Sequence, residues 1–92
     1  MILTANVPTK NGSRYLQQLC KHWSHKFETD FDAQQGVIAF PMGPIRMAAD
    51  EDTLTVAIDP VEGADVERFQ QVVADHLDRF AFREAPLSFD WQ

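Results

Sequence analysis

Two stretches of the chain repeat their apolar residues with the period of an α-helix. From residue 13 to about residue 26 they recur at i, i+3, i+4 and i+7, which forms one apolar stripe. These residues are Leu16, Leu19, Cys20 and Trp23. A second stripe over residues 64–80 consists of Val66, Phe69, Val73, Leu77 and Phe80. The pattern predicts two amphipathic helices. An Asn-Gly-Ser turn at residues 11–13 precedes the first, and its short polar side chains suit a helix N-terminus.

Shorter segments around and between these helices have the residue types of β-strands. They are residues 2–7, 27–32, 36–41, 45–50, 53–59 and 87–91. Several alternate apolar and polar residues, as residues 53–59 do with Leu54, Val56 and Ile58. A period of two indicates that one face of the sheet is buried and the other is in water, which favours an antiparallel meander. The expected element order is β-α-β-β-β-β-α-β.

This order predicts an α+β fold. Two amphipathic helices each need an apolar surface, and the buried face of the sheet supplies it. We therefore expect a two-layer sandwich, with both helices on one face of an antiparallel sheet, as a single domain over residues 1–92. The strand order resembles the TATA-binding-protein-like fold, which by itself carries no function.

Length and composition exclude several classes of protein. A chain of 92 residues has room for one core, and its single cysteine cannot form an internal disulfide. No apolar run approaches the roughly 20 residues of a membrane-spanning helix. The first ten residues lack the basic and long apolar regions of a signal peptide. We expect a cytoplasmic protein that does not bind membranes.

The net charge of −6 hides an uneven distribution. Residues 1–27 hold four of the eight lysine and arginine residues and none of the fourteen acids. Such a segment can bind an anion or an acidic partner, or it can lie against acidic neighbours within the fold. Four basic residues in an acidic protein are weak support for nucleic-acid binding, which we do not expect.

The first helix also carries a C-x-H-x-x-H pattern formed by Cys20, His22 and His25. On a regular helix Cys20 and His22 point about 160° apart, so they cannot share one metal ion. Cys20 also lies in the apolar stripe, where a free cysteine packs as a small hydrophobic residue. We therefore expect neither a metal site nor a nucleophilic thiol, and no cofactor is indicated.

A polar cluster between the helices is the main candidate site. His22 and Tyr15 lie at the edge of the first apolar stripe, and His76 and Arg79 lie along the edge of the second. If the helices pack side by side, these groups can face one another. One interpretation is a hydrogen-bonded network that only stabilises the interface. The other is a pocket for an anionic or chelating ligand, because arginine and histidine are natural donors to carboxylate and phosphate. The candidate ligand-binding residues are Arg14, Tyr15, His22, His25, His76, Arg79 and Arg83.

Three segments resemble the bacterial domain-of-unknown-function 2218 family: RYLQQLCKHWSHKF at 14–27, GVIAFPMG at 36–43 and VVADHLDRFAFRE at 72–84. The similarity extends over essentially the whole chain. The positions that carry it are Arg14, Tyr15, Leu19, Cys20, His22, Trp23, His25, Lys26, His76, Phe80, Phe82, Arg83 and Glu84. The family has no established catalytic residues to transfer. Its members are small stand-alone proteins, and the domain also occurs joined to siderophore-interacting flavoproteins of the ferric-reductase type.

The resemblance implies a link to iron metabolism, and we expect a non-enzymatic binding or accessory module associated with iron and siderophores. The basic first helix would suit an anionic small molecule such as a ferric chelate, or an acidic patch on a partner reductase. Two alternatives stay open. One is an enzyme of unknown reaction that uses the His/Arg cluster, and the other is a structural domain that self-associates as a homodimer.

Overall fold

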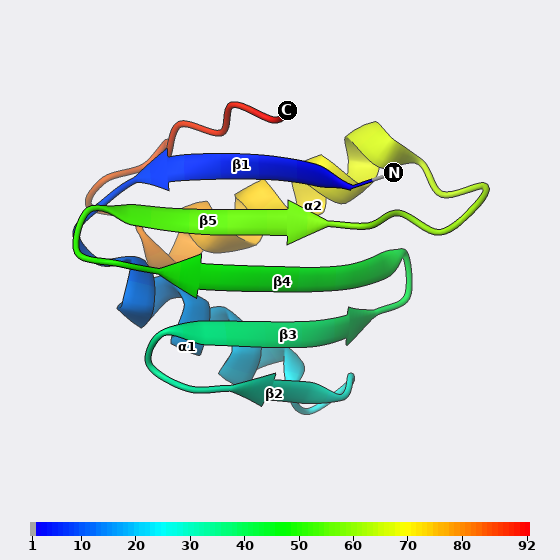
Figure 1. The fold of residues 1–92 in the computed structure, drawn as a ribbon, viewed down its shortest axis with the longest axis horizontal. Coiled ribbons are helices and arrows are strands. Elements are labelled where there is room, and N and C mark those ends of the chain that lie inside the picture. Colours follow the sequence, from blue (N-terminus) through cyan, green and yellow to red (C-terminus); the bar gives the residue numbers. More distant parts are fainter. Residues whose placement is uncertain (1) are drawn as a thin grey trace.

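The computed structural model describes residues 2–92, which form a five-stranded antiparallel sheet with two helices on one face (Figure 1). The strands are β1 (Leu3–Pro8), β2 (Thr29–Phe31), β3 (Gln35–Phe40), β4 (Gly43–Ala49) and β5 (Thr53–Ile58). The helices are α1 (Gly12–Trp23), between β1 and β2, and α2 (Val66–Phe80), after β5. The strands lie in the order β1-β5-β4-β3-β2, so a meander from β2 to β5 is completed by β1. This is the predicted two-layer α+β sandwich.

The alternation of residue types along the strands explains why only one face is covered. On β5, Leu54, Val56 and Ile58 point toward the helices and are fully buried. The threonine and alanine residues between them are only half-buried. The strands therefore present one apolar face to the helices and one face of small and polar side chains to water.

Each helix inserts its predicted stripe into the core against this face. From α1, Leu16, Leu19 and Cys20 are fully buried. From α2, the fully buried residues are Phe69, Val73 and Leu77. Asp65 caps the start of α2, where its carboxylate accepts a hydrogen bond from the backbone N–H of Arg68. Asn11 precedes α1 but its side chain makes no such cap.

The first helix is shorter than predicted, because α1 ends at Trp23 and not near residue 26. The backbone N–H groups of Lys26 and Phe27 both donate to the Trp23 carbonyl, which closes a turn after the helix. The turn sets the ring of Phe27 edge-on against the ring of Trp23, with centroids 6.2 Å apart. His25 and Lys26 consequently lie in a turn and not on the helix.

The predicted last strand over residues 87–91 is wrong in all but one residue. Only Trp91 pairs with a strand, through an isolated bridge to Ala5 on β1. The backbone N–H of Leu87 instead donates to the carboxylate of Asp78 on α2, at 2.8 Å. At the other end of the segment, the backbone of Gln92 exchanges two hydrogen bonds with that of Thr4 on β1.

Candidate functional site

Two histidine side chains from different helices meet on the helix side of the molecule. His22 comes from the last turn of α1 and His76 from the second half of α2. Their ring centroids are 5.6 Å apart with an interplanar angle of 46°. His22 is exposed and His76 is half-buried. The proximity that we expected from the two apolar stripes is therefore confirmed for this pair.

A hydrogen bond within α2 fixes the orientation of His76. Its Nδ1 lies 2.8 Å from the backbone carbonyl oxygen of Val72, one turn earlier. A carbonyl oxygen only accepts, so Nδ1 carries a proton and donates it. The neutral form of His76 therefore presents Nε2 as an acceptor or ligand atom on the other side of the ring.

Aromatic rings surround the histidine pair. The ring of Trp23 lies 4.7 Å from that of His76 and 6.3 Å from that of His22. Phe80 sets its ring edge-on to His22, with centroids 5.9 Å apart. Trp23 is itself fixed by Phe40 of β3, at 4.7 Å. The two imidazoles thus rest on a layer of rings that connects them to the core.

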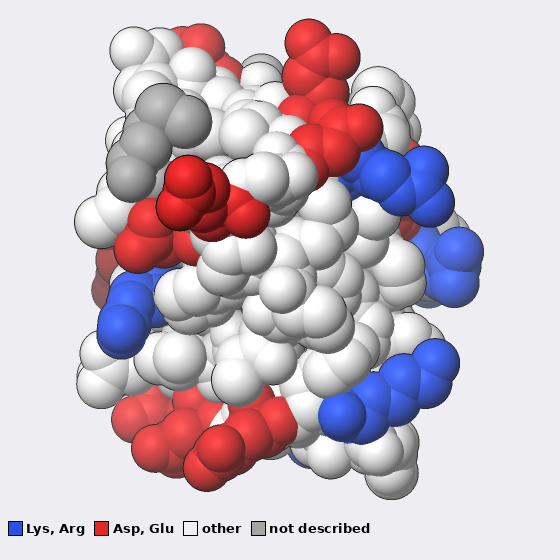
Figure 2. Space-filling model, turned by 90° about the vertical axis from the view of Figure 1, so that its right-hand side faces the viewer, with Lys and Arg blue, Asp and Glu red and all other residues white. Residues whose placement is uncertain are grey.

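Positive groups gather around His22. Its pKa is lowered by partial burial first, and then by the nearby His76, Arg79, Lys26 and His25. Positive charge on these neighbours disfavours a proton on His22 and so acts in the same direction as its burial. Figure 2 views the right-hand end of Figure 1, and most lysine and arginine side chains visible there lie on the helix side. We call His22, His76, Arg79, Lys26 and His25 the histidine surface.

Tyr15 does not belong to the histidine surface. Its hydroxyl group bonds to the carboxylate of Glu84, beyond the end of α2. The same carboxylate accepts from the Thr9 hydroxyl at 2.9 and 3.0 Å, and from the side-chain amide of Asn11 at 3.1 Å. Thr9 and Tyr15 are both buried. We call these four residues the Glu84 cluster, and its hydrogen bonds are those of a structural tie.

The remaining candidates also lie apart from the histidine pair. Arg14 is exposed at the start of α1, about two turns before His22. Arg83 is exposed beyond the end of α2, and its guanidinium group lies over the ring of Phe82, 5.8 Å from the centroid. Phe82 is 72% exposed. The seven predicted residues thus separate into the histidine surface, the Glu84 cluster and two exposed arginines.

Cys20 packs in the core, as expected. The residue is fully buried, and burial raises the pKa of its thiol to about 11. A protonated thiol without access to solvent is a poor nucleophile and a poor metal ligand. Within residues 2–92, no three histidine, cysteine, aspartate or glutamate side chains gather closely enough to hold a metal ion.

The Glu84 cluster is the part that sequence reasoning missed. Glu84 lies among the positions of the family resemblance, but no periodicity links it to the turn before α1. Outside a helix or strand, no periodicity predicts the direction in which an acidic side chain points. Only the Asn-Gly-Ser turn at residues 11–13 signalled polar chemistry there, and it suggested a helix cap.

The fold and this surface define a class: a small two-layer α+β domain with a basic histidine pair on its helix side. A family profile described as "Uncharacterized protein conserved in bacteria (DUF2218)" matches residues 4–92, and the chain belongs to this family. The chain is also similar to PA4090 from Pseudomonas aeruginosa, whose structure was solved by NMR. The two are 34% identical over 99% of this chain and 94% of that one, with a TM-score of 0.79. No curated protein matches.

In the described part of the chain, neither helix is long and apolar enough to cross a membrane.

Proposed function

We propose that this protein is a non-enzymatic binding module of iron metabolism that receives an anionic ferric chelate on the histidine surface. The observation that carries the proposal is the contact of His22 with His76 beside Arg79, with the centroids of the two imidazole rings 5.6 Å apart. The link to iron comes from the family resemblance. An acidic patch on a partner reductase would suit the same surface.

The chemistry of the surface supports an anion. The groups around His22 are cationic or can become so, and a bound negative charge would relieve their mutual repulsion. Arginine and protonated histidine form charge-assisted hydrogen bonds with carboxylate and phenolate oxygens. The half-buried ring of Phe80 beside His22 adds flat apolar contact for a planar chelating group.

The test is a titration of the full chain with gallium complexes of a catecholate, a hydroxamate and citrate, followed by NMR. Gallium replaces iron because it is diamagnetic and has the same charge and a similar size. We expect saturable shifts of the His22 and His76 ring signals with at least one complex. Metal-free chelators serve as comparison. Absence of shifts with all three complexes would overturn the chelate as ligand.

Two variants separate binding from folding. His22→Gln and Arg79→Gln should each weaken binding at least about tenfold, since a hydrogen bond to a charged group contributes about 1.5–3 kcal/mol. Arg68→Gln is the matched control, because Arg68 is an exposed arginine at the other end of α2. Equal weakening by all three variants would indicate a general charge effect and no defined site.

A further inference from the structure

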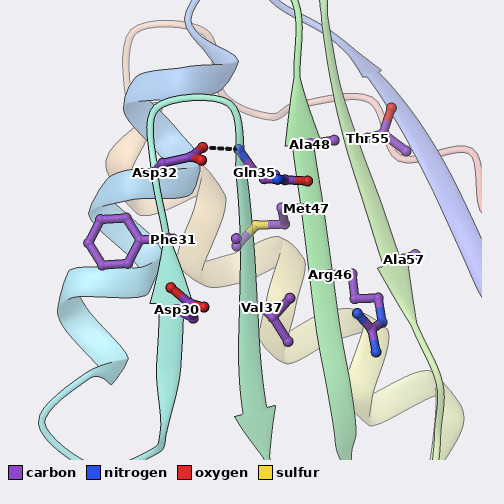
Figure 3. Close-up of a pocket in the computed structure, with 11 residues that line it drawn as sticks. Asp30, Phe31, Asp32, Gln35, Val37, Arg46, Met47, Ala48, Thr55 and Ala57 are labelled. Carbon is purple, nitrogen blue, oxygen red and sulfur yellow. Dashed lines mark hydrogen bonds between the residues drawn. The ribbon is translucent and has the colours of Figure 1, made fainter.

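The sheet face opposite the helices is uncovered, and it contains a hollow of about 480 Å³ (Figure 3). Its charged residues are Arg46 on β4 with Asp30 and Asp32 at β2. Between and beside these charges lie neutral side chains: Gln35, Val37, Ala48, Thr55 and Ala57. We propose that this face binds a second copy of the same chain, so that two sheets stack in a four-layer sandwich.

The register of the strands places the opposite charges in one row. Asp30 pairs with Val37, and Val37 pairs with Arg46. All three belong to the outward-facing positions, and Figure 3 shows Val37 between the acid and the arginine. Neighbouring strands lie about 4.8 Å apart, so the acid and the base flank Val37 at about that distance on either side. An acidic, an apolar and a basic side chain therefore follow one another along this row.

This row is self-complementary under two-fold symmetry. A two-fold axis parallel to the strands and above β3 exchanges the two sides of the row. Arg46 of each copy then lies over Asp30 of the other, and Val37 meets Val37. The outward residues on the axis itself are Gln35, Val37 and Ala39, which carry no charge. Two ion pairs form, and no like charges meet along that row.

Two-fold axes parallel to the strands and directly above one of the other three strands of this row (β2, β4 and β5) are less favourable. An axis above β4 would set Arg46 against Arg46 of the second copy. One above β2 would set Asp30 against Asp30. With the axis above β5, Asp30 of each copy would extend beyond the other sheet, because β2 lies at the far edge. Of these four axes, only the one above β3 pairs each acid with an arginine.

Small side chains allow the two sheets to approach. Ala39 on β3 and Ala48 on β4 occupy outward positions within the overlap. Stacked sheets lie about 10 Å apart, a gap that arginine and aspartate side chains from opposite sheets can bridge. Because the axis is off-centre, β5 and β1 extend past the overlap, and we expect a weak dimer. The histidine surface lies on the opposite side, so this proposal is independent of the proposed function.

The test uses charge reversal in the full chain, with the mass in solution measured by sedimentation at concentrations up to about 1 mM in low salt. The wild-type protein should dimerise as its concentration rises. Arg46→Asp and Asp30→Arg should each weaken association at least about tenfold, because symmetry repeats each repulsive contact. The double variant D30R/R46D should regain the wild-type affinity.

A mixture of the two single variants is the decisive measurement. One variant then carries acids at both positions and the other carries arginines at both. A heterodimer should form although neither variant associates with itself. Arg68→Asp on α2 is the control for net charge and should dimerise like the wild-type protein. Circular dichroism confirms that each variant folds.

Three results would overturn the proposal. The first is a wild-type protein that stays monomeric at about 1 mM. The second is a mixture of folded single variants that remains monomeric. The third is a monomeric wild-type protein whose Arg46 signals shift on addition of acetate, which would assign the hollow to a small carboxylate.

Discussion

Tyr15 and Glu84 are separated by 69 residues, and the tyrosine hydroxyl bonds directly to the glutamate carboxylate. Thr9 and Asn11 bond to the same carboxylate from the turn before α1. Glu84 belongs to the segment that follows α2. The Glu84 cluster therefore ties the end of the second helix to the start of the first.

Tyr15→Phe should destabilise the protein by about 1–2 kcal/mol, toward the low end for a hydrogen bond to a charged group, because Glu84 is exposed to solvent. Glu84→Gln should act in the same direction, because it removes the charge that strengthens all of the bonds. Chemical denaturation measures both. Glu51→Gln, at an exposed acid in the turn before β5, is the control and should change little. Equal stability of Tyr15→Phe and the wild-type protein would show that the bond contributes nothing.

The Glu84 cluster should also weaken at both extremes of pH. The hydrogen bond from Tyr15 contributes most to lowering the pKa of Glu84 below 4.5, so the stabilisation is lost as pH falls through that lowered value. Burial, followed by Glu84, raises the pKa of Tyr15 above 10.0, so stabilisation is lost again as pH rises through the raised value. Thermal melts across pH should show both losses in the wild-type protein. Tyr15→Phe should show a smaller alkaline loss.

His22 should titrate below 6.5, and NMR of its ring protons can follow this directly. Arg79→Gln should raise the pKa of His22, because it removes a nearby positive charge. Arg14→Gln, at the opposite end of α1, should leave the pKa of His22 unchanged.

The lowered pKa of His22 should also make stability depend on pH. A pKa lowered by folding means that the unfolded chain binds more protons, so stability falls as pH drops through 6.5. His22→Gln should therefore lose less stability than the wild-type protein between about pH 7 and pH 5. An unchanged pH profile in His22→Gln would contradict this account.

Gly36→Ala should destabilise by about 1–3 kcal/mol through overpacking. A Cβ atom at this position would lie 2.8 Å from the sulfur of Cys20 and 3.0 Å from the Cβ of Phe31. Cys20→Ala removes the first of these contacts. In the double variant the loss should be smaller than the sum of the two single losses, by about 0.5 kcal/mol or more. Urea denaturation of the four proteins gives the coupling.

Gly12→Ala provides the matched control for this cycle. A Cβ atom at Gly12 would contact Leu54, Ala49 and Thr53, and none of its three nearest atoms belongs to Cys20. Combined with Cys20→Ala, it should be additive. Coupling of the same size in both cycles would mean that Cys20→Ala loosens the whole core. It would then not act by making space for the methyl group that Gly36→Ala adds.

Residue periodicity predicted the sheet and the core, because burial follows directly from which face a side chain occupies. Leu54, Val56 and Ile58 illustrate this on β5. The same reasoning failed for residues 87–91, which alternate like a strand. Whether the N–H of Leu87 bonds to a strand or to Asp78 depends on where α2 lies, and no local pattern contains that information.

The arrangement of the candidate residues was predicted only in part, and the reason is similar. A helical projection gives the direction of a side chain but not its height along the axis. Tyr15 and His22 point the same way, yet seven residues separate them by about 10 Å along α1. His22 therefore meets His76, whereas Tyr15 reaches the segment after α2. Ligand binding at the histidine surface, and location in the cytoplasm, stay predictions.

At the outer edge of β1, the backbone N–H and C=O groups of Thr4 are bonded to Gln92. At the other edge, β2 is three residues long, and Asp30 and Asp32 place negative charge along it. Both edges are thus poor templates for strand addition, the route by which sheets grow into fibrils. If copies of this domain associate through their sheets, they do so by stacking face on face. Stacking about a two-fold axis ends at two subunits, so a domain whose edges resist strand addition would assemble no further than a dimer.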